Sequence, residues 1–207
     1  MNLQPLWEIR VHTPRLELRL PTGEELVELF RVAEGGIHPP DEMPFYFPWT
    51  DDLRLDAFLA FHHGTWAEWR PDKWVCNLIA FHDGQPIGSQ SVEAEDFRAK
   101  REVLTGSWLG EPFQGQGLGT EQRAAVLELA FSGLGAETAT SGSFAHNVKS
   151  QRVSEKLGYR HTGTRTMESR GEPVEHYDYR LDRADWESPV EVRLEGVGPA
   201  LPLFGAG

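Results

Sequence analysis

The sequence contains little cysteine and no long apolar segment. Of its 207 residues only Cys76 is a cysteine, which excludes an intramolecular disulfide and a metal site built from several thiolates. Because Cys76 lies in the strand-like run 74–79, we expect a buried core thiol in a reducing compartment. No window approaches a membrane-spanning apolar run, and the first residues lack the basic start and apolar core of a secretory signal. We therefore expect a cytoplasmic protein that does not enter a membrane.

Positive charge is also scarce, with 20 Lys and Arg residues against 32 Asp and Glu residues and a net charge of −12. This balance argues against a nucleic-acid partner. It favours a cationic acceptor such as an amine, or it reflects solubility alone. A hydrophobic content of 39% is that of a globular protein, and no linker or repeat divides the chain. We expect one domain over 1–187 and a tail over 188–207, which would add a strand and then be loose.

The most informative segment is rich in glycine. Gly115, Gly117 and Gly119 alternate within Phe113–Thr120, between a strand-like run at 103–109 and a helical run at 121–131. Glycine lets the main chain approach a ligand closely. A helix that begins here directs unpaired N–H groups and a partial positive charge at whatever lies before it. The segment therefore predicts a ligand whose phosphates are bound mainly by main chain.

Three kinds of phosphate loop compete for this segment. A Walker loop requires a lysine after its last glycine, and none follows here. A dinucleotide-binding loop requires G-x-G-x-x-G, but counting from Gly115 puts Thr120 where the third glycine belongs. The third pattern, [QR]-x-x-G-x-[GA], is met by Gln114, Gly117 and Gly119. It resembles the pyrophosphate loop of the GNAT superfamily of N-acetyltransferases, which bind acetyl-coenzyme A.

A second segment resembles the same superfamily. Residues 147–159 match N-x-x-[AS]-x-x-[LV]-x-x-K-x-G-[FY] at every defined position, and Asn147 is a good helix N-cap. Phrases such as W-L-G at 108–110 and T-P-R-L-E-L-R at 13–19 resemble the ribosomal-protein-alanine acetyltransferase branch. The resemblance covers roughly residues 12–187. It implies an α/β (α+β) GNAT fold: a mixed, mostly antiparallel central sheet of six to seven strands, splayed after the fourth strand, with about four flanking helices.

Periodicity and turn residues predict the elements. Thr22 and Glu25 form a capping-box pattern before a helix. Asp83-Gly84 and Gly171-Glu172-Pro173 each read as the turn of a hairpin. The adjacent His62 and His63 point to different sides of a helix, so we expect no metal site there. The expected helices are about 22–33, 53–69, 121–131 and 147–157, and the expected strands are 16–20, 74–81, 87–93, 103–109, 137–141, 159–167 and 175–181.

The resemblance implies a binding site for an acyl-CoA and no metal. Main-chain N–H groups of the glycine loop would hold the pyrophosphate, and the preceding strand would pair with the pantetheine arm, where the Leu109 N–H polarises the thioester carbonyl. The Asn147 side chain would bind pantetheine, or serve only as a helix cap. The expected cofactor-binding residues are Ser107, Trp108, Leu109, Gln114, Gly115, Gln116, Gly117, Leu118, Gly119, Thr120, Asn147 and Ser150.

Two proton transfers remain to be assigned. The tyrosine that commonly protonates the thiolate in the superfamily falls at Ser154, so that duty passes elsewhere or is dispensable. Ser150 is the expected donor, with a plain turn serine as the alternative. A protonated amine has a pKa of about 10, and Glu93 is the expected base that neutralises it. Alternative bases are His146, Asp41 and Glu42, and the substrate-binding residues expected in the aromatic loop 35–52 are Asp41, Phe45, Phe47 and Trp49.

The predicted function is that of an acyl-CoA-dependent N-acyltransferase, with acetyl-CoA as the expected donor. A primary amine, on a small molecule or a protein N-terminus, would attack directly in a ternary complex. Succinyl-CoA or another acyl-CoA is an alternative donor, because a basic residue near the acyl end would admit a carboxylate. Ser154 leaves a second class open, a catalytically silent CoA-binding sensor or interaction module. An edge strand near the C-terminus would permit a homodimer, and neither nucleic acid nor membrane is an expected partner.

Overall fold

Nine strands form one sheet in the computed structural model, which describes residues 1–207. Their spatial order is β7-β8-β6-β5-β4-β3-β2-β1-β9, and only β5 and β6 pair in parallel. The sheet is therefore mixed and mostly antiparallel, as predicted. The strands are β1 (Arg10–His12), β2 (Glu17–Arg19), β3 (Lys73–His82), β4 (Gln85–Glu95), β5 (Glu102–Leu109), β6 (Thr138–Phe144), β7 (Arg160–Ser169), β8 (Glu172–Asp182) and β9 (Arg193–Glu195).

The predicted strand count of six to seven is too low, because both chain ends add a short strand. β9 pairs with β1, and β1 pairs with β2, at the edge of the sheet. Since β1 precedes the first expected strand, the splay follows the fifth strand in chain order instead of the fourth.

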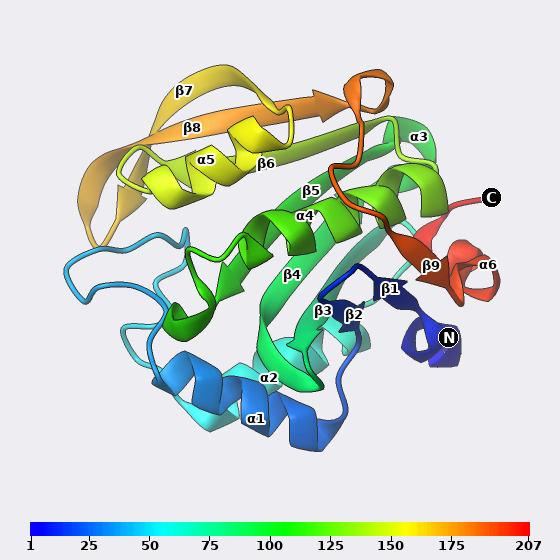
Figure 1. Ribbon diagram of the computed structural model, residues 1–207, viewed down its shortest axis with the longest axis horizontal. Helices are drawn as coiled ribbons and strands as arrows, with labels where there is room; N and C mark the ends of the chain where they lie inside the picture. Colours follow the sequence, from blue (N-terminus) through cyan, green and yellow to red (C-terminus); the bar gives the residue numbers. More distant parts are fainter.

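Helices cover both faces of the sheet (Figure 1). The predicted first helix begins with the expected capping box, since the Thr22 hydroxyl accepts from Glu25 N and the Glu25 carboxylate accepts from Thr22 N. α1 and α2 lie together on one face, whereas α4 and α5 lie on the other. The helices are α1 (Gly23–Glu34), α2 (Leu55–Ala67), α3 (Phe97–Lys100), α4 (Leu118–Glu128, continued by a π-helical turn), α5 (Val148–Lys156) and α6 (Val197–Ala200).

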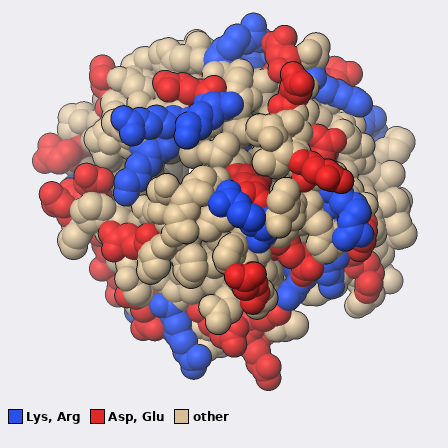
Figure 2. All heavy atoms as spheres, viewed as in Figure 1, with Lys and Arg blue, Asp and Glu red and all other residues tan.

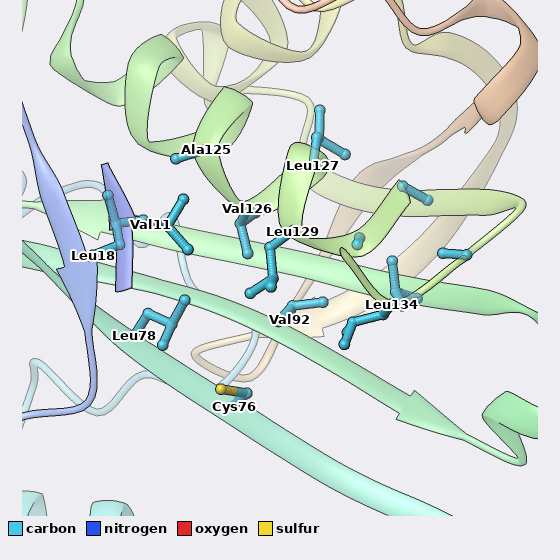
Figure 3. Packing of buried hydrophobic residues seen from close by; sticks show 14 of the residues in the cluster. Val11, Leu18, Cys76, Leu78, Val92, Ala125, Val126, Leu127, Leu129 and Leu134 are labelled. Atoms are coloured by element: carbon cyan, nitrogen blue, oxygen red, sulfur yellow. The ribbon is translucent and has the colours of Figure 1, made fainter. Parts of the chain in front are cut away.

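The largest core cluster lies between the sheet and α4 (Figure 3). Val126 and Leu129 on the helix side meet Leu78 and Val92 on the strands. Cys76 lies in the same layer and is fully buried, as expected of a core thiol. Burial raises the pKa of the Cys76 thiol to about 12, so the thiolate that would react as a nucleophile is not formed near neutral pH.

The C-terminal tail is packed, although its end was expected to be loose. Phe204 is fully buried in the core cluster, and Leu203 is nearly so. Two buried indoles explain this, because an indole N–H needs an acceptor when it leaves water. Trp69 Nε1 donates to Leu203 O at 2.8 Å, and Trp74 Nε1 donates to Phe204 O at 3.0 Å.

The two predicted hairpins are present, with one shifted turn. Asp83 and Gly84 both have positive φ between β3 and β4, as a two-residue hairpin turn requires. In the second hairpin the turn residues are Arg170 and Gly171, and Pro173 belongs to β8. Pro173 is tolerated there because it lies beyond the last pair of β6 with β8, where β8 has one neighbour. None of the helices combines the length with the apolar character that a membrane span requires.

Candidate functional site

The site begins where β5 and β6 part. The two strands pair only from Glu102 with Thr138 to Leu104 with Thr140. Hydroxyls extend the contact briefly, since Thr105 Oγ1 donates to Thr140 O at 3.1 Å. Beyond that point β5 continues to Leu109 with β4 on one side only. Its other edge keeps main-chain groups that could pair with an extended ligand.

A cavity of about 810 Å³ opens at this splay. Its wall is formed by β5, β6, the start of α4, α5 and the loop between α1 and α2. Most of the predicted site residues line it: Phe45, Ser107, Trp108, Leu109, Gln114, Gly115, Gly117, Gly119, Thr120, Asn147 and Ser150. The predicted residues outside its wall are Asp41, Phe47, Trp49, Glu93, Gln116 and Leu118.

The glycine loop has the geometry of an anion site. Gly115 and Gly117 have φ of 74° and 81°, in the left-handed region that favours glycine. The first main-chain bond of α4 runs from Glu121 N to Gly117 O. The N–H groups of residues 115–120 donate to no acceptor within the chain. A phosphate before the helix would therefore meet several free donors together with the helix dipole.

Side chains brace this loop from three directions. Gln114 Nε2 donates to Ile37 O and Leu109 O, and its Oε1 accepts from Lys149 Nζ at 3.0 Å. Arg15 donates to Gln116 O and pairs with the buried Glu121. The Gln114 side chain thus holds the loop in place through hydrogen bonds to protein groups, in addition to lining the cavity.

The helix α5 contributes both polar and basic groups. Asn147 Oδ1 accepts from Ser150 N at 3.1 Å, so Asn147 caps the helix while it also lines the cavity. Lys149, Arg152 and Lys156 are exposed along the same helix and line the cavity wall. Figure 2 shows Lys and Arg gathered over α5 on a molecule whose net charge is −12. A local positive surface at the cavity of an acidic protein suits a polyanionic ligand.

Ser154 and Ser150 have different surroundings. Ser154, at the position of the usual tyrosine, is 1% exposed and faces the core instead of the cavity. Ser150 is half-buried in the cavity wall. Of these two hydroxyls, only the Ser150 hydroxyl can meet a ligand in the cavity.

A buried arginine lies at the splay without an acidic partner. Arg123 on α4 is 3% exposed and lines the cavity. Its guanidinium donates to Gln90 Oε1 on β4 at 3.3 Å, Ser107 Oγ on β5 at 2.8 Å and Ser141 Oγ on β6 at 3.0 Å. No carboxylate lies within ion-pair distance of it. Burial lowers the pKa of Arg123, with the phenol of Tyr159 opposing this. Arg123 thus connects β4, β5 and β6 at the level where the pairing of β5 with β6 has ended.

The predicted acceptor pocket divides into packing and exposed residues. Trp49 lies 5.2 Å from Phe45 and 5.7 Å from Trp108, ring centre to ring centre, and so connects the loop to β5. Phe47 is 73% exposed. Asp41 is also exposed. Of these residues only Phe45 and Trp108 reach the cavity wall.

The expected bases also occupy different surroundings. Glu93 pairs with Leu104 across β4 and β5, on the face that α1 and α2 partly cover. Burial raises the pKa of its carboxyl, which no charged partner opposes. His146 Nε2 lies 3.0 Å from Met43 O, and its ring stacks on Phe144. Glu42 lines the cavity. Among the side chains of Glu93, His146 and Glu42, only that of His146 has a hydrogen-bond partner, Met43 O in the loop between α1 and α2.

Sequence reasoning missed two features of the site. Arg123 follows Glu121 and Gln122. Polar helix residues are usually exposed, whereas all three of these are buried. His176 and Asp178 read as the polar side of an alternating strand. Their nearness to the splay depends on the pairing of β8 with β6, which no local pattern reports.

Comparisons with known proteins agree with this geometry. Residues 15–160 match the family model described as acetyltransferase (GNAT) domain. The matched range includes both motifs and the whole of the splay.

Solved structures resemble the chain at low identity. A putative ribosomal-protein-serine acetyltransferase from Vibrio cholerae has 20% identity and a TM-score of 0.65, over 84% of this chain and 97% of that one. RimJ from Mycobacterium smegmatis, in complex with CoA-disulfide, has 16% identity and a TM-score of 0.70, over 86% and 88%. The microcin C7 self-immunity acetyltransferase MccE, in complex with acetyl-CoA and AMP, has 15% identity and a TM-score of 0.65, over 82% and 93%. At these identities the likeness shows a shared fold.

Proposed function

Because this chain belongs to the GNAT acetyltransferase family, whose co-substrate is an acyl-CoA, we propose that it transfers the acyl group of acetyl-CoA to a primary amine. The free N–H groups of residues 115–120 at the start of α4 carry this proposal. They would bind the pyrophosphate, and Lys149, Arg152 and Lys156 would meet the remaining phosphate charge. The donor would thus extend along the cavity, with its phosphates at the glycine loop and its thioester at the splay.

The reaction would take place at the free edge of β5. Pantetheine would pair there as an additional strand, and the Leu109 N–H would polarise the thioester carbonyl. The amine, on a small molecule or a protein N-terminus, would attack in a ternary complex, and the C–S bond would break. Ser150 would donate to the departing thiolate. Glu93, the base expected from the sequence, is one candidate for the proton acceptor: burial raises the pKa of its carboxyl, although it lies outside the cavity wall. If Glu93 has this role, Glu93→Gln lowers kcat and shifts its pH profile, and an unchanged profile removes it.

Calorimetric titration with acetyl-CoA, free CoA and NAD tests the donor. We expect binding of both CoA species and none of NAD, since the third glycine of a dinucleotide loop is absent. Release of CoA thiol in the presence of a panel of primary amines then tests turnover. Binding of CoA without turnover of any amine would favour the alternative of a CoA-binding sensor or interaction module.

A second donor class is favoured by Arg123. A buried guanidinium whose partners are all neutral lacks the counter-charge that buried ions normally have. An acyl group with a terminal carboxylate, as in succinyl-CoA, would supply it where Arg123 lines the cavity. Comparison of the thermal stabilisation by acetyl-CoA and succinyl-CoA tests this alternative. Greater stabilisation by succinyl-CoA at equal concentration supports it, and equal or smaller stabilisation rejects it.

A further inference from the structure

Two glycines lie at the splay where the strands face away from α4. Gly106 on β5 and Gly142 on β6 each lie two residues beyond the last pair of these strands, Leu104 with Thr140. They are therefore level with each other, and both line the cavity. Because side chains alternate along a strand, both would project toward the face of α1 and α2. Neither strand therefore places a side chain of its own over the splay at this level.

An imidazole occupies the space over one of these glycines. A Cβ on Gly142 would lie 2.4 Å from Cε1 and 2.7 Å from Nε2 of His176. The ring, from β8, thus lies against the β6 main chain, packed edge-on to Phe144. On the other side, Ser91 Oγ would lie 3.0 Å from a Cβ on Gly106. His176 and Ser91 therefore flank the opening over the splay.

The orientation of His176 leaves one nitrogen free on that side. Its Nδ1 lies 3.2 Å from Asp178 Oδ1, and Arg165 Nη2 lies 3.1 Å from the same oxygen. The contact does not have hydrogen-bond geometry, since Nδ1 is buried without a hydrogen-bond partner. The negative charge of Asp178 nevertheless favours the tautomer with the proton on Nδ1, which leaves the lone pair on Nε2. Nε2 makes no hydrogen bond within the chain and is not among the fully buried unpartnered atoms.

The charges around His176 are few. β8 and β7 supply Asp178 and Arg165, and β6 supplies only Phe144 and Gly142. His146 stacks on Phe144. No group of the loop between α1 and α2 is within ion-pair distance. Burial lowers the pKa of His176, whereas the charge of Asp178 raises it. The effect of burial is larger, so the pKa of His176 lies below its usual value. The ring is thus neutral near pH 7 and able to accept a proton.

We propose that His176 is the proton acceptor for the incoming amine, with Asp178 as the residue that orients it. The inference rests on the proposed acyl transfer. Nε2 takes one proton from the ammonium form of the acceptor, directly or through a water molecule, and later releases it to solvent. The neutral nitrogen forms the C–N bond at the thioester carbonyl as the C–S bond breaks. The second proton from nitrogen goes to the CoA thiolate, so amide and CoA thiol are released.

The position distinguishes His176 from Glu93. Glu93 pairs with Leu104, so it lies on β4, deeper than the two glycines and across β5 from the splay. His176 is 9% exposed and is not itself part of the cavity wall, but its ring lies directly over Gly142, which is.

The pH dependence of His176→Gln tests the proposal. The probe reaction is thiol release from acetyl-CoA with a primary amine that the wild type acetylates, chosen from benzylamine, cadaverine and alanyl and seryl dipeptides. At pH 7 we expect kcat/KM for the amine to fall on the order of 10²–10⁴-fold. The deficit should shrink as the pH approaches the pKa of the amine, about 10 for an alkyl amine and about 8 for a dipeptide N-terminus, where the amine is already largely neutral. Asp178→Asn should move the acid limb of the profile to lower pH, because the carboxylate raises the pKa of His176.

Controls separate this result from a structural effect. His63→Gln changes an exposed histidine on α2 and should leave the profile unchanged. His176→Gln should bind acetyl-CoA as tightly as the wild type. If the wild type itself does not bind acetyl-CoA, the proposed function is wrong, whatever the role of His176. A loss by the same factor at every pH, or no loss, contradicts the role of His176. Imidazole ¹⁵N NMR of the wild type requires no acceptor: a proton on Nδ1 at pH 7 supports the role, and a proton on Nε2 overturns it.

Discussion

Arg123 donates a 2.8 Å hydrogen bond to Ser107 across the gap between α4 and the strand that ends at the glycine loop. The same guanidinium reaches Ser141 on the other side of the splay. Hydroxyl groups accept hydrogen bonds from the guanidinium but do not neutralise its charge. The positive charge of Arg123 is therefore uncompensated, and an anion beside it would be stabilised. If the acyl group binds at the splay as proposed, Arg123 would distinguish a carboxylated acyl group from a neutral one.

Arg123→Met is expected to affect carboxylated donors selectively. Hydrogen bonds to a charged group contribute about 1.5–3 kcal/mol, which predicts on the order of 10–100-fold weaker binding of succinyl-CoA. Binding of acetyl-CoA should change little, because its phosphates would bind at the start of α4 and its acyl group carries no charge. Calorimetry with both donors measures the difference. An equal loss for the two donors would mean that Arg123 only connects the strands.

Gly88→Ala is expected to disturb the site through β5. A Cβ on Gly88 would lie 2.2 Å from Trp108 O and 2.9 Å from Leu109 Cα, both main-chain atoms. The strand must therefore shift, at a cost of about 1–3 kcal/mol in the free energy of unfolding. Acetyl-CoA affinity should fall as well. Gly64→Ala is the control, since nothing lies near its Cβ in α2, and it should stabilise by about 0.5–1 kcal/mol. Urea unfolding that ranks the two in the reverse order would refute this description of β5.

Burial of His62 predicts a loss of stability in mild acid. His62 on α2 is 3% exposed, and burial lowers its pKa to about 4 from 6.5. The unfolded chain therefore binds a proton first as the pH falls through 6.5, and the free energy of unfolding decreases until about pH 4. Between pH 7 and pH 5 the loss should be ~2 kcal/mol. His62→Leu should remove this part of the dependence in urea titrations, and an unchanged slope would show that His62 is not the source.

Cys76 is expected to be inert in the folded protein. Its thiol is fully buried, with a pKa raised to about 12, and the thiolate is the reactive form. A thiol reagent such as dithionitrobenzoate should label no cysteine in the native chain and one after denaturation. Stoichiometric labelling of the native protein would contradict the assigned burial. The same property makes thiol release a clean assay for acyl transfer here.

Local patterns predicted the elements around the site well, because each has a short-range cause. The Thr22 capping box, the Asp83-Gly84 turn and the glycine loop depend on residues within a few positions of one another. The cavity wall at Gln114, Asn147 and Ser150 was likewise expected from two compact motifs. In each case the main-chain geometry follows from residues adjacent in sequence.

The remaining features depend on pairings between distant segments. Glu121 is buried because Thr13 and Arg15 of the β1–β2 turn bind its carboxylate, and no helix pattern reveals that partner. His176 reaches Gly142 only because β8 pairs with β6. The packed tail depends on two indoles more than 100 residues earlier in the chain. Such contacts depend on the tertiary structure, so local patterns in a single sequence do not predict them.

Titration of two glycine variants with acetyl-CoA tests the central claim most directly. Gly117 and Gly171 share a φ of 81°, so a glutamate strains both alike, but Gly171 lies in the β7–β8 turn with nothing near its Cβ. Only Gly117→Glu adds a carboxylate where the pyrophosphate would bind. We predict that the wild type and Gly171→Glu bind acetyl-CoA and that Gly117→Glu does not. Absence of binding by the wild type, or equal binding by both variants, would contradict the assignment of this loop.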